Sequence, residues 1–234
     1  MSYPLNGDYI DIHNHGSTPQ EGVFILDNLM AHEGILPVRM NGITFSSGIH
    51  PWFLTESNHT GLLEIVRKNA SDELISAIGE AGFDKLKGPT MELQRSIFEE
   101  QVLLSEKFKK PLVIHCVRGW DELIASHKKI KPEMPWLIHG FRGSKELALQ
   151  LVSRNMYISF WFDFVIRPEA TSLVRSLPVD RIFLETDGSG VDIREIYNKV
   201  SEDIEITVEE LKHQLLSNYS CVFKINGLTQ GSAK

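Results

Sequence analysis

The sequence has little of what would place it in a membrane, outside the cell or on long duplex DNA. It contains no run of about 18 apolar residues, and its N-terminus lacks the basic and apolar regions of a signal peptide. Only two cysteines occur, Cys116 and Cys221, which is too few for a disulfide framework, so we expect a cytoplasmic location. The formal net charge of −7 argues against a broad basic surface for gripping duplex nucleic acid.

What the sequence does have is enough apolar surface for one core. Hydrophobic residues make up 42% of the 234 positions, which predicts one compact domain over residues 1–226. The last residues, GLTQGSAK, show no apolar period, and we expect 227–234 to be a flexible tail. No internal repeat is visible.

Eight short apolar runs predict strands. They are YIDIH, VFILDNL, ITFSSGIH, LISAIGE, PLVIHCV, WLIHGF, MYISFWF and RIFLETD. From the third run onward, helical patterns separate them: residues 60–70, 90–109, 120–130, 144–155 and 169–176, with a last helix from about 209. Ser144 is placed to cap one of these helices, and Thr207 with Glu210 has capping-box spacing.

Alternating strands and helices of this length predict a parallel sheet with helices outside it. Eight strands favour an α/β fold of the (β/α)8 TIM-type barrel class over an open sheet. The connections between the first three strands are too short, or too rich in glycine and proline, for helices. We therefore expect a barrel trimmed of helices between the first strands.

Ionisable residues close five of the predicted strands. Strand alternation places two histidines of the first strand on one face, and the C-terminal ends of barrel strands converge on one mouth. The six residues are His13, His15, Glu80, His115, His139 and Asp187. Each alone has a plain structural alternative, such as a hydrogen-bonded core histidine or an ion-paired glutamate, but together they require six coincidences at the same end of successive strands.

Four imidazoles and two carboxylates form a donor set that suits first-row divalent metals. Six protein ligands are too many for one catalytic ion that must keep a free position. They are about right for two ions that activate a water and clamp substrate oxygens. We expect two divalent metal ions, Zn²⁺, Mn²⁺ or Mg²⁺, although the imidazoles lean away from Mg²⁺.

Six segments in this order resemble the TatD family of metal-dependent hydrolases, within the amidohydrolase-like barrels. They are IDIHNHG, GIHPW, AIGEAGFD, KPLVIHCVRG, LIHGFRGS and FLETDG. The resemblance implies that the six strand-end residues are metal ligands, that Glu80 bridges or approaches both ions, and that Asp187 orients or deprotonates the attacking water. It also implies a deoxyribonuclease, while some members are linked to other hydrolysis, including deacylation of aminoacyl-tRNA.

Residues at the rim bear on the substrate. Arg118 and Arg142 each lie three residues after a predicted ligand, and we expect them to hold phosphates of DNA. The family resemblance departs here, since Arg118 sits one position late and Arg142 stands where serine is common. The alternative for either arginine is a surface ion pair. His50 is expected to contact the substrate or a ligand, or to pack in the core, and Asp84 to partner a basic group.

Charge and site together favour short DNA strands or single-stranded ends as the substrate, hydrolysed from an end. Three alternatives remain open on the sequence. The same metals could act on an amide, ester, lactone or aminoacyl-tRNA bond. The chain could be a non-catalytic metal-binding scaffold. A structural metal site would normally be closed and rich in cysteine, which this chain is not. The oligomeric state is left open.

Overall fold

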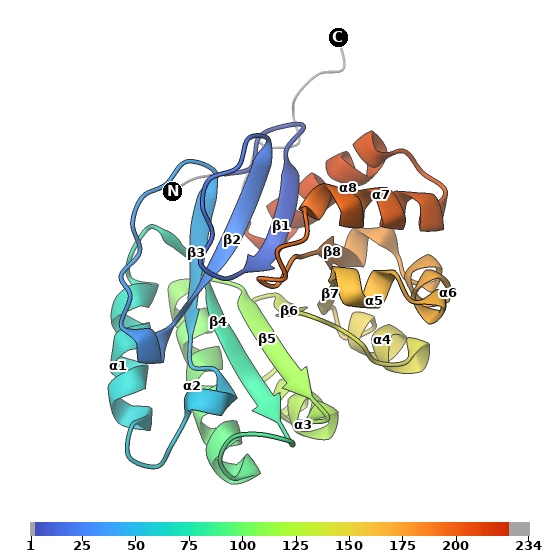
Figure 1. Ribbon diagram of the computed structural model, residues 1–234. Coiled ribbons are helices and arrows are strands. Elements are labelled where there is room, and N and C mark those ends of the chain that lie inside the picture. Colours follow the sequence, from blue (N-terminus) through green and yellow to red (C-terminus); the bar gives the residue numbers. More distant parts are fainter. Residues whose placement is uncertain (1–2, 225–234) are drawn as a thin grey trace. The chain divides into compact units, whose positions relative to one another are not determined.

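The strands of the computed structural model, which describes residues 3–224, form one eight-stranded sheet in chain order (Figure 1). The predicted tail, 227–234, lies outside the described residues. Within the sheet, β1 pairs with β2, β3 with β4, β4 with β5, β5 with β6 and β7 with β8, all parallel. The strands are β1 (Tyr9–Asn14), β2 (Val23–Met30), β3 (Ile43–Gly48), β4 (Ile75–Asp84), β5 (Leu112–Val117), β6 (Trp136–Ile138), β7 (Tyr157–Phe160) and β8 (Ile182–Leu184).

Helices separate the strands from β3 onward. They are α1 (His59–Ala70), α2 (Met91–Phe108), α3 (Trp120–Ile130), α4 (Lys145–Val152), α5 (Phe162–Val165), α6 (Pro168–Ser176), α7 (Ile193–Ile204) and α8 (Val208–Val222), with short 3₁₀ turns η1 (Ala31–Glu33), η2 (Pro51–Phe53) and η3 (Val179–Arg181). Between β1 and β3 the structure places only η1. The prediction of a (β/α)8 fold trimmed of helices between its first strands is confirmed. No helix among the described residues is long and apolar enough to cross a membrane.

The described residues cluster into two compact units. The first contains Asn28–Arg39 and Thr44–Ile138, and the second contains 3–27, Met40–Ile43 and 139–224. The single domain predicted over residues 1–226 stays a prediction.

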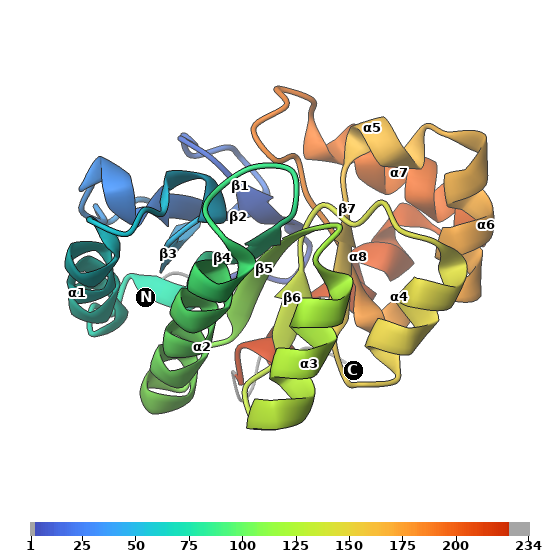
Figure 2. The same ribbon diagram turned by 90° about the horizontal axis from the view of Figure 1, so that it is seen from below.

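In the first unit, helix α2 packs on the outer side of β4, and α3 follows it along the sheet (Figure 2). Thr90 caps α2 by accepting a hydrogen bond from the Leu93 amide. Phe98, buried on the inner face of α2, contacts the rings of Phe83 (centroids 4.8 Å apart) and Trp136 (5.3 Å). Burial of Phe98 against these two rings thus ties α2 to β4, which carries the predicted ligand Glu80, and to β6, which precedes His139.

A glycine lets β4 and β5 come close beside those ligands. Gly82 is the register partner of His115, and a Cβ at this position would overlap the carbonyl oxygen of His115. Only a residue without a side chain fits there. Gly82 therefore allows β4 and β5, which both carry predicted ligands, to approach each other closely.

In the second unit, β1 lies beside β8, and the C-terminal helices contact β1. The Asp187 amide donates to the His13 carbonyl at 3.1 Å. The Tyr197 hydroxyl of α7 bonds both the amide (2.9 Å) and the carbonyl (3.2 Å) of Ile10. Thr207 and Glu210 form the predicted capping box at the start of α8. These contacts fix the strand that bears the two neighbouring histidines.

Several predicted bounds were wrong in detail. The predicted sixth and eighth strands were too long, because β6 ends at Ile138 and β8 at Leu184, so His139 and Asp187 lie on the loops that follow. β4 runs on to Asp84. Helices α5 and α7 were not predicted, although α7 carries apolar residues at helical spacing: Ile193, Ile196, Tyr197 and Val200.

Candidate metal centre

Three predicted ligands converge in the second unit. The Nε2 atoms of His13 and His15 lie 3.2 Å apart. The Asp187 Oδ1 atom lies 3.7 Å from the first and 3.5 Å from the second. His13 is fully buried, whereas His15 and Asp187 are partly exposed, so the cluster has a closed side and an open side.

The spacing of these donors fits a shared divalent ion. Two donors that are each about 2.1 Å from a tetrahedral ion lie about 3.4 Å apart, and the three observed separations of 3.2, 3.7 and 3.5 Å fall around that value. Imidazole and carboxylate are also the donor types that zinc and manganese accept. The residues present therefore fit a metal ion with an open position towards solvent.

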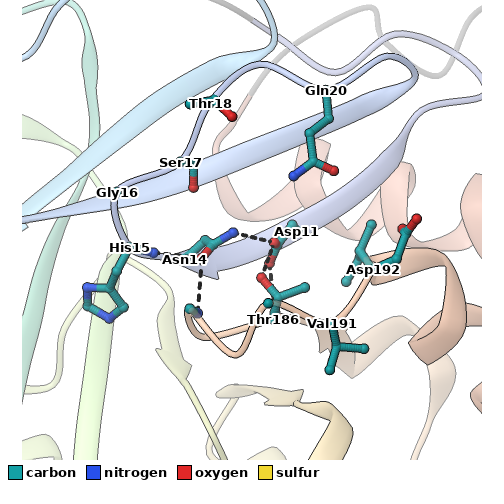
Figure 3. Close-up of a pocket in the computed structure, with 13 residues that line it drawn as sticks. Asp11, Asn14, His15, Gly16, Ser17, Thr18, Gln20, Thr186, Val191 and Asp192 are labelled. Carbon is teal, nitrogen blue, oxygen red and sulfur yellow. Dashed lines mark hydrogen bonds between the residues drawn. The ribbon is translucent and has the colours of Figure 1, made fainter.

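A hydrogen-bond network that starts from the buried Asp11 supports this cluster (Figure 3). Asp11 accepts from the Thr186 amide (2.9 Å), the Thr186 hydroxyl (2.5 Å) and the Asn14 side-chain amide (3.0 Å). The Asn14 oxygen in turn accepts from the amides of His15 (2.8 Å) and Gly188 (3.0 Å). Burial raises the pKa of Asp11 to about 7, against the lowering effect of the Thr186 hydrogen bonds. The network ties β1 to the loop after β8 on either side of the ligands.

A polar pocket of about 370 Å³ opens beside His15. Its lining includes Ser17, Gln20 and Asp192, and Figure 3 shows these side chains around the space next to the Asp11 network. The pocket lies beside the segment that joins β1 to β2. In a regular (β/α)8 barrel a helix joins these strands, whereas in this protein a short polar loop does so.

The first unit brings together two predicted ligands and the rim residue His50. Glu80 is 3% exposed, and its Oε1 atom lies 2.9 Å from His115 Nδ1 and 3.2 Å from His50 Nε2. These three residues form a second group whose donor atoms could hold a metal ion. Sequence reasoning left His50 between a substrate contact, a ligand contact and core packing, and the structure places it against Glu80, a predicted ligand.

The hydrogen bonds of the two histidines give them different roles. His50 Nδ1 accepts from the Trp52 amide at 3.1 Å, so in the neutral ring Nε2 carries the proton and donates to Glu80. His115 is the reverse case, because its Nε2 lies 3.2 Å from Asp84 Oδ2. A proton there leaves Nδ1 with a lone pair facing the Glu80 carboxylate, an arrangement that a shared cation stabilises.

Asp84 is an anchored carboxylate. Besides His115 it accepts from Trp52 Nε1 (2.6 Å) and from the amides of Leu86 (2.7 Å) and Lys87 (3.0 Å). Burial acts to raise the pKa of Asp84, but these hydrogen bonds outweigh burial and hold the pKa below its ordinary value. A carboxylate that fixes the outer nitrogen of a metal-facing histidine is a common device of metal sites. Sequence reasoning expected a basic partner for Asp84, and the structure gives it an imidazole.

A third group lies in the second unit and contains a residue that the sequence reading missed. His139 Nδ1 is 3.4 Å from Glu185 Oε1, and both could share an ion with Asp187. Glu185 is fully buried and accepts a hydrogen bond from Ser159. Its place in FLETD, two residues before a ligand, was the available signal.

The two rim arginines differ in surroundings. The Arg142 guanidinium lies 4.1 Å over the ring of Trp161. Burial lowers the pKa of Arg142, and the nearby carboxylate of Asp187 opposes that effect. Arg118 is exposed and adopts a left-handed conformation with φ of 55°. Neither arginine makes an ion pair within residues 3–224, so the surface ion pair considered as the alternative is absent there.

These features define a metal-dependent hydrolase of the (β/α)8 class: donor groups that could hold divalent ions lie on parallel strands or on the loops that directly follow them. The chain belongs to the TatD-related DNase family, whose model matches residues 38–224. The matched range includes Glu80, His115, His139 and Asp187, while His13 and His15 precede it.

Relatives of known sequence and structure agree with this assignment. The chain is 26% identical over 183 residues to "Deoxyribonuclease Tat-D" of Schizosaccharomyces pombe, covering 72% of this chain and 59% of that protein. It is 25% identical over 197 residues to "Uncharacterized metal-dependent hydrolase YabD" of Bacillus subtilis, covering 76% of each. The crystal structure of YjjV, a TatD homologue from Escherichia coli, superposes with a TM-score of 0.78 at 21% identity, over 94% of this chain and 100% of that one. The match thus spans less than two thirds of the S. pombe protein.

Proposed function

We propose that this protein is a divalent-metal-dependent deoxyribonuclease that removes nucleotides from short or single-stranded DNA ends. The observation that carries the proposal is the convergence of His13, His15 and Asp187 at separations suited to one ion, with an open side to solvent. Support for a nucleic-acid substrate comes from the family and from the deoxyribonuclease name of the S. pombe relative.

The proposed centre uses the six strand-end residues as ligands of two divalent ions: His13, His15, Glu80, His115, His139 and Asp187. Zn²⁺, Mn²⁺ and Mg²⁺ are the candidate ions, with imidazole favouring the first two. Glu80 is the ligand expected to serve both ions. Three donor groups support the proposal. Two lie in the second unit (His13, His15 and Asp187; His139, Glu185 and Asp187), and one lies in the first (His50, Glu80 and His115).

Bound ions would supply a water of lowered pKa and neutralise charge on the phosphoryl oxygens. The side chains of this protein then have separate tasks. Asp187 presents Oδ1 at the open side of its cluster, where it accepts or orients the proton of the attacking water. His50 and Asp84 hold Glu80 and His115 in place through hydrogen bonds. The arrangement fits in-line attack at phosphorus, with the products a nucleotide and a shortened strand.

The proposed substrate-binding residues are Arg118 and Arg142, which would contact the strand directly, and His50, which would act through Glu80. The two arginines are exposed, lack carboxylate partners among residues 3–224, and follow ligand-bearing strands. A guanidinium binds a phosphate through two parallel N–H groups, so these residues would hold the strand at the mouth. His50 contributes through Glu80, since its ring already donates to that carboxylate.

The test is a metal-dependence assay on end-labelled DNA. The protein is stripped with chelator, reloaded separately with Zn²⁺, Mn²⁺ or Mg²⁺, and given single-stranded and duplex substrates. Asp187→Asn is the catalytic variant, because asparagine tolerates the left-handed backbone at this position (φ of 49°). Asp192→Asn is the matched control, since Asp192 caps α7 and is not one of the proposed ligands.

Cleavage that requires metal, fails in Asp187→Asn and persists in Asp192→Asn would support the proposal, and the product ladder would give polarity. A protein that holds metal yet leaves every DNA uncut would overturn the nuclease assignment. Hydrolysis of an ester, amide or aminoacyl-tRNA panel would then assign the same centre to that chemistry. Bound metal without hydrolysis of any substrate in these panels would favour a non-catalytic metal-binding scaffold, and absence of bound metal after loading would overturn the proposed metal centre.

A further inference from the structure

A second cavity in the second unit is lined by basic side chains. It has a volume of about 230 Å³ and lies between the loop after β6 and the α5–α6 segment. Three cations line it, Arg142, Lys145 and Arg167, together with the hydroxyl-bearing residues Ser144 and Ser172. Glu169 is the one carboxylate in the lining, so positive charge prevails.

The cations in this cavity lining make no ion pairs within residues 3–224, although the protein is acidic overall. Acidic residues outnumber basic ones by 31 to 24, and many surface cations are used in ion pairs, such as Arg175 with Glu205 and Arg194 with Asp192. None of the three cations in the cavity lining makes an ion pair within the described part of the chain. Like charges gathered in a hollow repel one another, and an anion between them removes that cost.

The cations are also held in position. Arg142 is stacked on Trp161 at 4.1 Å, which leaves the edge of its guanidinium for hydrogen bonds. Arg167 Nε donates to the Asp163 carbonyl at 2.9 Å, which anchors that side chain on the backbone of α5. Lys145 is the first residue of α4, after the capping Ser144. Two anchored guanidiniums and an ammonium suit the oxygens of a phosphate.

Arg142 links this cavity to the candidate metal centre through charge. The predicted ligand Asp187 and the cavity residue Arg167 both act electrostatically on its guanidinium. A strand whose scissile phosphate lies at the ligands can therefore place another phosphate against Arg167 and Lys145. An enzyme that acts on a single nucleotide would have no second phosphate to place in such a cavity.

We propose that Arg142, Lys145, Arg167 and Ser172 form a phosphate subsite that binds a non-scissile phosphodiester of a single-stranded substrate. This inference rests on the proposed nuclease function and extends it. The subsite would make the protein prefer longer substrates. A strand with several phosphates can occupy both the metal centre and the subsite, whereas a single phosphodiester occupies only the metal centre. Each additional contact is electrostatic and therefore weakened by salt.

The experiment compares two probes on the metal-loaded protein. One is an eight-nucleotide single strand, and the other is thymidine 5′-(4-nitrophenyl phosphate), which has one phosphodiester. Arg167→Ala and Lys145→Ala should each raise KM for the strand by about tenfold, the loss expected for a hydrogen bond to a charged group. The single-phosphodiester substrate should be unaffected, and kcat should stay unchanged. Arg175→Ala is the matched control, since Arg175 lies in α6, the helix that follows Arg167, but is paired with Glu205.

The salt dependence of kcat/KM is a second measurement. It would not change if Arg167 and Lys145 only supported the structure. Each lost phosphate contact should reduce the slope of log(kcat/KM) against log[salt] by about 0.7 for a single strand. Unchanged KM and slope in both variants would refute the subsite, and so would equal losses on both probes. Inorganic phosphate should compete with the strand only weakly, because one phosphate ion occupies one phosphate site whereas the strand occupies two.

A binding measurement separates this inference from the nuclease proposal. Fluorescence anisotropy with an eight-nucleotide phosphorothioate strand reports affinity without cleavage. If the wild-type protein cuts no DNA but binds this strand in an Arg167-dependent way, the nuclease assignment falls and the subsite stands. If it cuts DNA while Arg167→Ala binds the strand as the wild type does, the subsite falls and the nuclease assignment stands.

Discussion

The tautomer of His50 leads to a prediction about metal affinity. Its Nδ1 accepts from the Trp52 amide and its Nε2 donates to Glu80, which is 3% exposed. In proteins asparagine can replace the Nδ1 position of histidine and glutamine the Nε2 position, by length. His50→Asn should therefore keep the bond from Trp52 and lose the bond to Glu80, whereas His50→Gln should keep a donor towards Glu80.

The expected magnitude follows from the charge and burial of Glu80. A hydrogen bond to a buried charged group contributes about 1.5–3 kcal/mol, which corresponds to roughly 10- to 150-fold in an equilibrium constant. Loss of a residue that orients a metal ligand costs about 10- to 100-fold in metal affinity or activity. We therefore expect His50→Asn to weaken metal binding by at least tenfold and His50→Gln to retain most of it.

The assay is competition for Zn²⁺ or Mn²⁺ against a fluorescent chelator, which needs no substrate. His32→Asn is the control, since His32 stacks on Phe53 with ring centroids 3.7 Å apart and is exposed. If His50→Asn and His50→Gln bind metal equally well, or lose affinity equally, the assigned proton on Nε2 is wrong. Circular dichroism on each variant would separate a loss of metal from a loss of fold.

Further predictions concern the strands that hold the site. Tyr197→Phe should lower the free energy of unfolding by about 1–3 kcal/mol, because it leaves the buried amide and carbonyl of Ile10 without their partner; urea titration measures it. Gly82→Ala should prevent stable folding, since its Cβ overlaps the His115 carbonyl, and a variant as stable as the wild type would contradict the close strand approach. Gly61→Ala, in α1 with open space around it, should instead stabilise the protein by about 0.5–1 kcal/mol.

The sequence was informative about strands and ligand types because both obey short-range rules. Apolar runs bounded by turn residues predicted all eight strands, and the ionisable residues that close five of these runs were predicted as metal donors. Two separate facts made the His13–His15 pair predictable: the period of a strand is two residues, and the donors are close in the chain. The capping residues Ser144 and Thr207 follow equally local chemistry.

Contacts between residues distant in the chain were not predictable in this way. Glu185 meets Ser159 and His139 from other strands, and no spacing within FLETD states that. The role of His50 depends on the direction of the Trp52 amide, which a sequence does not give. Helix α7 is a different case, because its pattern at Ile193, Ile196 and Val200 is local and was open to the same reasoning that found the other helices.

The contacts between β1 and the C-terminal helices bear on the order of synthesis. The Tyr197 hydroxyl reaches Ile10 across 187 positions of sequence, and Tyr219 of α8 packs its ring against Phe24 of β2 with centroids 5.2 Å apart. During translation the strand with His13 and His15 thus emerges first, but the helices that contact it emerge last. The nascent chain must carry this apolar strand pair without its covering helices until α7 and α8 leave the ribosome, and an apolar strand left uncovered for that period is prone to mispairing. We expect the demand on chaperones to be set by this interval, and a chain cut before α7 to hold all six proposed ligand residues without a formed centre.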